Sequence, residues 1–299
     1  MKNKFGKKSL YRNQMRMGYA LIVPAFLLFI VFFAYSLVQA FHYSLLDWDG
    51  VGKQVYIGFQ NYVELFQDVV FGKAFLNSWL YTIGLMLFGV LPGLILAYLL
   101  SGEHIIGRTF FRSVYFFPRI VSAVIYGVVW KWIYDPRKGL LTMIIDALGG
   151  EGSSFAMLGD IKTAMLGITI TGGWTYFGFC MVIFLAAFMG IDTSLKESAV
   201  LDGANKFQVF WKVVIPQIKP VLNTVIIYTV IDSFKVYDLV LVMTNGGPNE
   251  STQVMTYYIY KQAFTMNRFG YGSAAAILLG IVMVIFTIIY NKSFGKEEV

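Results

Sequence analysis

Six long apolar stretches alternate with short polar connections along the 299-residue chain. Each stretch approaches or exceeds the roughly 20 residues that an α-helix needs to cross about 30 Å of hydrocarbon. Because a backbone in lipid must satisfy its own hydrogen bonds, we expect each stretch to be helical. The predicted spans are approximately Met17–Phe41, Leu76–Leu100, Val114–Tyr134, Ala164–Met189, Val221–Met243 and Gly272–Tyr290. This pattern predicts an all-α membrane protein with about six transmembrane helices.

Lysine and arginine are concentrated in every second connection, which predicts the orientation of the chain. They number six in residues 1–16, two in 101–113, four in 190–220 and two in the C-terminal tail, against seven in all the alternate connections. Basic connections face the cytoplasm, so both termini and residues 190–220 are predicted to be cytoplasmic. The expected organisation is a basic tail (1–16), one membrane domain (17–290) and a short C-terminal tail (291–299).

Composition excludes several classes of function. The chain is 57% hydrophobic and 14% charged, whereas soluble domains carry about 25% charged residues. The net charge of +7 does not indicate nucleic-acid binding, because the basic residues are spread over loops and the N-terminal tail. One cysteine and two distant histidines argue against disulfides and metal sites. The first apolar run is too long for a signal peptide, whose apolar region has about 7–15 residues, so we expect a retained helix.

The connection between the fourth and fifth predicted spans is polar but patterned as two short helices. Ser194–Glu197 fits a capping box, which predicts a helix from Ser194 to about Leu201. Gly203 permits a turn that a side chain would obstruct. A second helix is predicted over about Asn205–Ile215, and Pro216 either ends it or opens the next span. Such a rigid hairpin suits a soluble partner; the alternative is an interfacial hairpin anchored by aromatic and lysine residues.

The same connection resembles the EAA loop of binding-protein-dependent ABC importers, whose pattern is EAA-x3-G-x9-I-x-L-P. Every spacing agrees. Ser198 replaces an alanine, Val213 an isoleucine and Ile215 a leucine, and all three changes are conservative. In that family the loop docks on a cytoplasmic ATPase, so residues 191–219 are expected to be a coupling loop. The residues assigned to ATPase coupling are Glu197, Ser198, Ala199, Asp202, Gly203, Val213, Ile215 and Pro216. Residues 197–216 are called the EAA-like segment below.

The resemblance extends along most of the chain. Ile57–Tyr62, Trp130–Tyr134 and Thr244–Pro248 are similar to elements of sugar permeases, the last to the maltose-permease and glycerol-phosphate-permease branch. This implies a type I ABC importer permease fold in a bacterial cytoplasmic membrane, and a transport subunit rather than an enzyme. It also implies a second homologous permease subunit, two copies of an ABC ATPase and an extracytoplasmic solute-binding protein. The implied cargo is a sugar or oligosaccharide.

Cofactors are expected on the partners and not on this chain. The chain contains no G-x4-G-K-[ST] phosphate loop, so ATP and Mg²⁺ are assigned to the partner ATPase. It also contains no H-E-x-x-H or G-x-S-x-G motif, so we expect no catalytic residue and no metal site.

Charged residues inside the fifth predicted span are candidates for the solute path. Asp232, Lys235 and Asp238 recur every three residues, which would place them on one face of a continuous helix. Charges at membrane depth usually face a cavity or the bundle interior, and Lys235 can pair with either acid through i,i+3 contacts. The alternative is an ion pair that locks this span to its neighbours or to the partner permease, and both roles can coexist. With aromatic and hydroxyl groups suited to a sugar, the substrate-path candidates are Trp174, Tyr176, Asp232, Lys235, Tyr237 and Asp238.

Other features of the spans have simpler interpretations. The glycines in residues 89–93 favour close helix packing, and those in 171–178 either pack closely in the same way or loosen the helix so that Trp174 or Tyr176 can stack on a sugar. Arg119 and Lys131 are expected to extend to the interfaces or to cap carbonyls freed by Pro118, and a gating role is the alternative. Three other functions stay open from the residues alone. They are an importer of another solute such as glycerol phosphate or a peptide, an ion-coupled transporter that uses the Asp-Lys-Asp trio, and a membrane scaffold.

Overall fold

The computed structural model describes residues 4–102 and 105–294, and these are mostly helical, with one two-stranded hairpin. Contacts divide the chain into two compact units. The first unit consists of residues 1–65 with 262–278, and the second of residues 66–261 with 279–299. The single membrane domain expected over residues 17–290 therefore stays a prediction.

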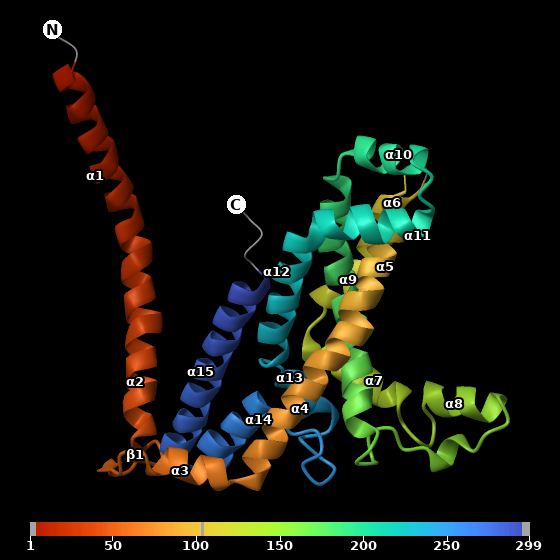
Figure 1. Ribbon diagram of the computed structural model, residues 1–299. Helices are drawn as coiled ribbons and strands as arrows, with labels where there is room; N and C mark the ends of the chain where they lie inside the picture. The colour runs from red at the N-terminus through yellow and green to blue at the C-terminus, as the bar shows by residue number, and fades with distance from the viewer. Residues whose placement is uncertain (1–3, 103–104, 295–299) are drawn as a thin grey trace. The chain divides into compact units, whose positions relative to one another are not determined.

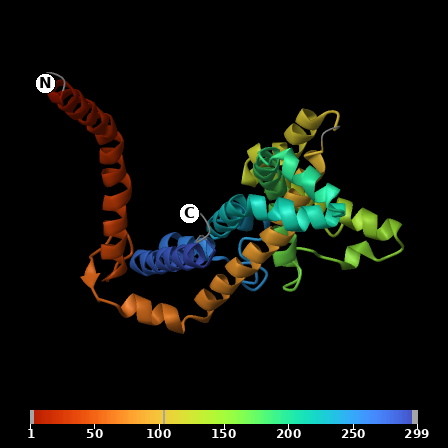
Figure 2. The ribbon, with the colours of Figure 1, turned by 45° about the horizontal axis from the view of Figure 1, so that its top comes forward.

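The first unit begins with a long helix. Its segments α1 (Lys4–Phe29), η1 (Ile30–Ala34) and α2 (Tyr35–Ser44) follow one another without a gap, and the helix curves along its length (Figures 1 and 2). Its apolar part, Met17–Ser44, is long enough to cross a membrane. Residues 30–34 form a π-turn, a common cause of bending in long helices.

A small hairpin follows this helix in the first unit. The strands β1 (Leu46–Asp47) and β2 (Val55–Tyr56) pair antiparallel. The buried amide of Asn61, in α3 (Gln60–Gln67), donates to the carbonyls of Ser44 and Leu46 at 2.9 Å each. That side chain satisfies two backbone acceptors where the helix ends, and so it holds the start of the hairpin in place. The segment η5 (Lys261–Thr265), from residue 262 onward, and the first part of α15 (Phe269–Phe294) complete the unit.

The second unit is a bundle of helices with one long central helix. Its elements are α4 (Val69–Leu85), η2 (Met86–Val90), α5 (Leu91–Leu100), α6 (Arg108–Ile120), α7 (Ala123–Ile133), α8 (Leu140–Ala147), η3 (Gly152–Ser154), α9 (Ala164–Met189), α10 (Thr193–Leu201), α11 (Lys206–Val209), η4 (Phe210–Val214), α12 (Ile215–Ser233), α13 (Asp238–Met243), α14 (Met255–Tyr260) and the rest of α15.

Helix α9 lies at the centre of this unit and has the bounds predicted for the fourth span. Over half of its most apolar window is buried (56%), compared with 28% for the helix Lys206–Ser233. Glycines make this packing possible. A Cβ atom on Gly178 would overlap the backbone carbonyl of Tyr115, and one on Gly173 would lie 2.5 Å from the Cβ of Phe88. These contacts confirm the close-packing interpretation of the glycines, because only a hydrogen fits between the backbones.

Replacing Gly178 with alanine is expected to destabilise the second unit by about 1–3 kcal/mol or more, because α6 and α9 must move apart to admit the methyl group. The midpoint of thermal unfolding of the purified protein in detergent measures this effect. Gly280→Ala is the matched control, since a Cβ atom at Gly280 meets nothing within 4 Å. Equal midpoints for the two variants would contradict the packing argument.

Five helices among the described residues are long and apolar enough to cross a membrane, or six if one bent pair counts as a single span. The bent pair is α6 and α7, which meet at 96° where a straight third span was expected. Helix α6 ends two residues after Pro118, and Val121 is extended (φ −74°, ψ 139°). Pro118 lies inside α6 and perturbs the turn that precedes it, so the proline does not by itself place the break after Ile120.

The fifth predicted span is also wrong in its bounds. A continuous helix starts earlier, at Lys206, and stops at Ser233; α13 begins only at Asp238. The hydroxyl of Thr256 donates to the carbonyl of Phe234 and so satisfies an acceptor in the break. Asp238 lies in the first turn of α13, where a carboxylate is favourable to the helix dipole. Asp232, Lys235 and Asp238 therefore do not share a face of one helix.

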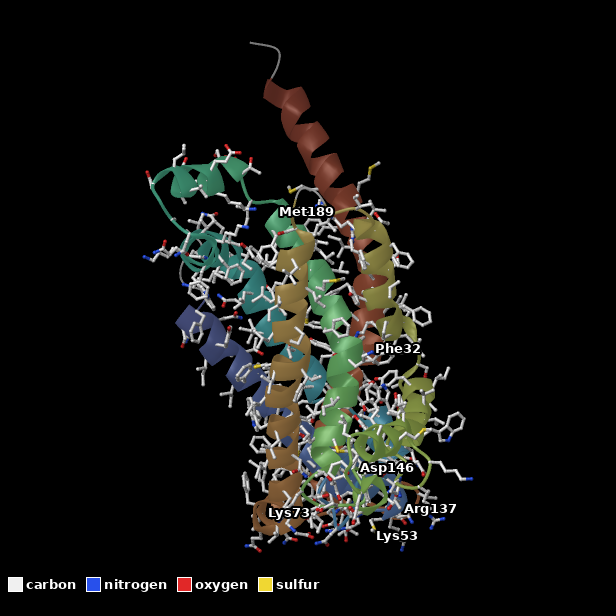
Figure 3. All side chains as sticks on the ribbon, turned by 90° about the vertical axis from the view of Figure 1, so that its right-hand side faces the viewer. Phe32, Lys53, Lys73, Arg137, Asp146 and Met189 are labelled. Carbon is white, nitrogen blue, oxygen red and sulfur yellow. The ribbon has the colours of Figure 1, made fainter. Side chains whose placement is uncertain are left out.

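The two ends of the second unit are formed by different elements. Helices α10 and α11 lie at the C-terminal end of α9, and α8 lies toward the other end (Figure 1). In Figure 3, Met189 marks the first end, and Lys73, Asp146 and Arg137 lie near the second. The EAA-like segment is therefore at the end of the bundle opposite the α8 connection.

Candidate functional site

The hairpin of residues 193–214 consists of α10, a turn, α11 and η4. Helix α10 starts one residue earlier than expected, because the carboxylate of Asp192 accepts the amide of Ser194 at 2.9 Å. Hydrogen bonds from that amide and from the serine hydroxyl lower the pKa of Asp192. The capping box predicted at Ser194–Glu197 is thus wrong. A capping box is present at the second helix, where Asn205 and Gln208 each bond the other's amide at 2.9 Å.

The turn of the hairpin is a Schellman motif that requires glycine. The amide of Ala204 donates to the carbonyl of Ala199, and the amide of Gly203 donates to that of Val200, both at 3.0 Å. Gly203 has φ +83°, and a Cβ atom there would meet nothing within 4 Å. The turn predicted at Gly203 is present, and backbone conformation rather than space selects glycine there.

Residues of the EAA-like segment divide into an inner and an outer set. Ala199, Val213 and Ile215 pack against the apolar core of the second unit, and a hollow of about 360 Å³ lies beside the turn at Gly203. The outer set is exposed and consists of Glu197, Ser198, Asp202, Gly203 and Pro216. The exposed set and its apolar neighbour Leu201, 87% exposed, form a surface that combines acidic and apolar side chains. This surface is available to a soluble partner.

The second helix of the hairpin continues into the fifth span. Segments α11, η4 and α12 run without a gap from Lys206 to Ser233. Pro216 lies in the first turn of α12, so it opens this segment and does not end the helix. The π-turn Phe210–Val214 directly precedes the proline. A wider turn accommodates a proline ring that would clash with the carbonyl of a regular α-helix.

A pocket of about 170 Å³ opens within the second unit, among α4, α6, α7, α9, α12 and α13. Five of the six substrate-path candidates line it, and Trp174 does not. Trp174 packs on Trp130 with 5.7 Å between ring centroids, and 38% of it is exposed. The lining residues are Tyr81, Leu85, Arg119, Ala123, Tyr126, Gly172, Thr175, Tyr176, Asp232, Lys235, Val236, Tyr237, Asp238 and Leu239.

An ion pair in this pocket links the fifth span to a neighbouring span, as the structural alternative for these charges expected, although its arginine was not predicted. A guanidinium nitrogen of Arg119 is 3.1 Å from a carboxylate oxygen of Asp232. The guanidinium also lies over the rings of Tyr176 and Phe179, 5.2 and 5.3 Å from their centroids. Lys235 forms no ion pair among the described residues, so the pairing with Asp232 or Asp238 that the spacing allowed is not formed. Arg119 pairs with an acid and does not extend to an interface.

Four tyrosines and one threonine among the other lining residues carry hydroxyl groups. The hydroxyl of Tyr176 donates to the hydroxyl of Thr229 at 3.0 Å, and Tyr81, Tyr126 and Thr175 add further hydroxyls. Sequence reasoning missed Tyr81, Tyr126 and Thr175, which lie in apolar runs without a distinguishing pattern. One signal could have indicated Arg119: it is a cation in one apolar span, while another span contains two acids and a single lysine.

Comparisons with known proteins agree with this architecture. A family model described as binding-protein-dependent transport system inner membrane component matches residues 89–295. The probable ABC transporter permease protein YurN of Bacillus subtilis is 34% identical and covers 94% of this chain and 97% of its own. The diacetylchitobiose uptake system permease protein NgcF of Streptomyces coelicolor is 32% identical over 91% of this chain and 81% of its own. The trehalose/maltose transport system permease protein MalF of Thermococcus litoralis is 29% identical over 98% of each chain.

A solved structure has the same fold. A chain of a bacterial ABC transporter involved in the import of the acidic polysaccharide alginate superposes with a TM-score of 0.84. The superposition covers 97% of this chain and 100% of that chain, at 22% sequence identity. The ABC importer permease fold expected from the resemblance is thereby confirmed.

Proposed function

The chain belongs to the family of binding-protein-dependent transport system inner membrane components, and on this premise we propose that it forms half of the translocation pathway of an ATP-driven importer for a sugar or oligosaccharide. It is a multi-pass membrane protein and a transport subunit rather than an enzyme. The alternatives of another solute, an ion-coupled transporter and a scaffold receive no support from its relatives, several of which are named for saccharides.

One observation carries the proposal. An exposed hairpin with the EAA-like segment and a pocket lined by tyrosines and charged groups are joined by one helix, Lys206–Ser233. Tyrosine rings suit the apolar face of a sugar, and the hydroxyls and charges suit its hydroxyl groups. The substrate-path residues are then Tyr176, Asp232, Lys235, Tyr237 and Asp238.

The partners follow from the same proposal. The hairpin docks on one of two copies of a cytoplasmic ABC ATPase, which bind ATP and Mg²⁺. A second homologous permease subunit supplies the other half of the pathway, and an extracytoplasmic solute-binding protein delivers the solute. Both termini of this chain face the cytoplasm, in agreement with the positive-inside rule.

The mechanism is a change between an inward-facing state and a state in which the pocket is open to the outside. Closure of the ATPase dimer on ATP displaces the hairpin, rotates the fourth and fifth spans and opens the pocket to the outside. Docking of the loaded solute-binding protein favours the same state, because it makes contacts that the inward-facing state lacks.

Reconstitution tests this proposal. We expect proteoliposomes that contain this chain, its partner permease and the ATPase to accumulate saccharide only with the solute-binding protein and with ATP on the ATPase side. A protonophore should leave the uptake rate within about twofold, since no ion gradient drives the transport. Uptake that persists without ATP and stops with the protonophore contradicts the proposal.

A further inference from the structure

One continuous helix connects the hairpin to the pocket. It starts at Lys206 in the hairpin and ends at Ser233, with Asp232 in its last turn. Twenty-eight residues at about 1.5 Å each give a path of about 42 Å along the helix axis, which turns between α11 and α12 (Figure 1). A displacement of the hairpin along or across this helix therefore reaches Asp232 without passing through a loop.

Three spans meet at the ion pair formed by Asp232. Arg119 comes from the last turn of α6, just before the 96° bend of the third span, and Asp232 lies just before the break of the fifth. The rings of Tyr176 and Phe179 on α9 flank the guanidinium. The pair thus joins the two interrupted spans at the points where their backbones leave helical geometry.

Neutral hydrogen bonds fix the same end of α12. The hydroxyls of Ser233 and Thr82 lie 2.6 Å apart, and Thr229 accepts from Tyr176. These bonds position α12 against α4 and α9 and make no contact with the third span. Among the hydrogen bonds and ion pairs described for residues 4–102 and 105–294, the Arg119–Asp232 contact is the one that links α12 to α6.

We propose that Arg119 and Asp232 are positioning residues that transmit displacement of the hairpin to the third span and so couple ATP hydrolysis to opening of the pocket. This inference rests on the proposed function. A charge-assisted hydrogen bond is shorter and stronger than a neutral one and holds its partners in register. Each side chain is less than one-third exposed, so solvent weakens the attraction less than at a surface. The third span then follows α12 instead of moving independently.

The deciding variant is the neutral pair Arg119→Met with Asp232→Leu. Removing one partner alone leaves an uncompensated charge in a partly buried site, whereas removing both does not. The complete importer is assembled in proteoliposomes with its solute-binding protein, and the ATP hydrolysed per solute transported is measured. We expect assembly with the ATPase at the parental level and at least a tenfold higher ATP cost per solute. Arg119→Lys, which keeps the charge, should raise that cost by less.

Arg112→Gln is the matched control, because Arg112 is an exposed arginine of the same helix and forms no ion pair among the described residues. It should leave the ATP cost unchanged. Parental coupling in the neutral double variant overturns the inference, and so does loss of its assembly, since the pair would then serve folding rather than coupling. Neither outcome affects the proposed function, which fails separately if the parental importer transports without ATP.

Discussion

Valine in place of Gly203 is expected to abolish solute uptake and ATPase association while the chain still inserts into the membrane. Gly203 is in the left-handed region at φ +83°, which costs a residue with a side chain about 1–2 kcal/mol. A β-branched side chain is a rarer occupant still. The two hydrogen bonds of the Schellman turn are then lost, and α10 no longer packs on the helix that follows.

Insertion should persist because the turn lies outside the apolar segments that enter the membrane. Membrane content by immunoblotting, co-purification of the ATPase and uptake rate are the three measurements. Gly190→Ala is the matched control, since Gly190 caps α9 in the same connection with an ordinary φ of −84° and no crowded neighbour. Normal ATPase association of Gly203→Val would exclude the hairpin as the docking element.

Reversal of charge at Glu197 is expected to have an equally large effect for a different reason. Glu197 is exposed on α10 and forms no hydrogen bond or ion pair among the described residues. Glu197→Lys therefore leaves the hairpin folded but presents a like or unpaired charge to the partner. Like charges placed opposite each other across an interface reduce the binding free energy by several kcal/mol, which is enough to prevent binding. We expect uptake to fall at least tenfold and ATPase co-purification to fall with it.

The control for this variant is Glu151→Lys. Glu151 is also exposed, and it lies in the connection between α8 and α9, away from the hairpin along the bundle. This change should leave ATPase association intact. Equal loss of association in both variants would indicate general misfolding instead of a local contact.

The two variants also separate the roles within the EAA-like segment. Gly203 acts through backbone geometry, so conservative and bulky replacements should both be harmful in proportion to their strain. Glu197 acts through its charge, so Glu197→Gln should retain more association than Glu197→Lys. The inner residues Ala199, Val213 and Ile215 contact the core. Substitutions at these positions should lower the stability of the protein more than they lower its affinity for the ATPase.

Local properties of the chain were predictable from the sequence. The bounds of the fourth span and the place of the hairpin turn agree with the structure, because span length and the need for glycine at positive φ depend on neighbouring residues alone. The first cap was misplaced by only a small shift, because Asp192 and Ser194 are both good capping residues. Membership of the pocket was predictable for five of six candidates, because charged and polar groups avoid lipid.

The sequence by itself determined the fold class, the apolar segments and the hairpin, since each depends on residues close together in the chain. Tertiary structure alone decided the two interrupted spans and the partner of Asp232. Arg119 and Asp232 are 113 residues apart, and either acid could equally have paired with the nearby Lys235 by spacing. The break at residues 234–237 removed that option, because it ended the helix on which such pairing depends. The packing of both α6 and α12 against α9 brought the arginine to the acid.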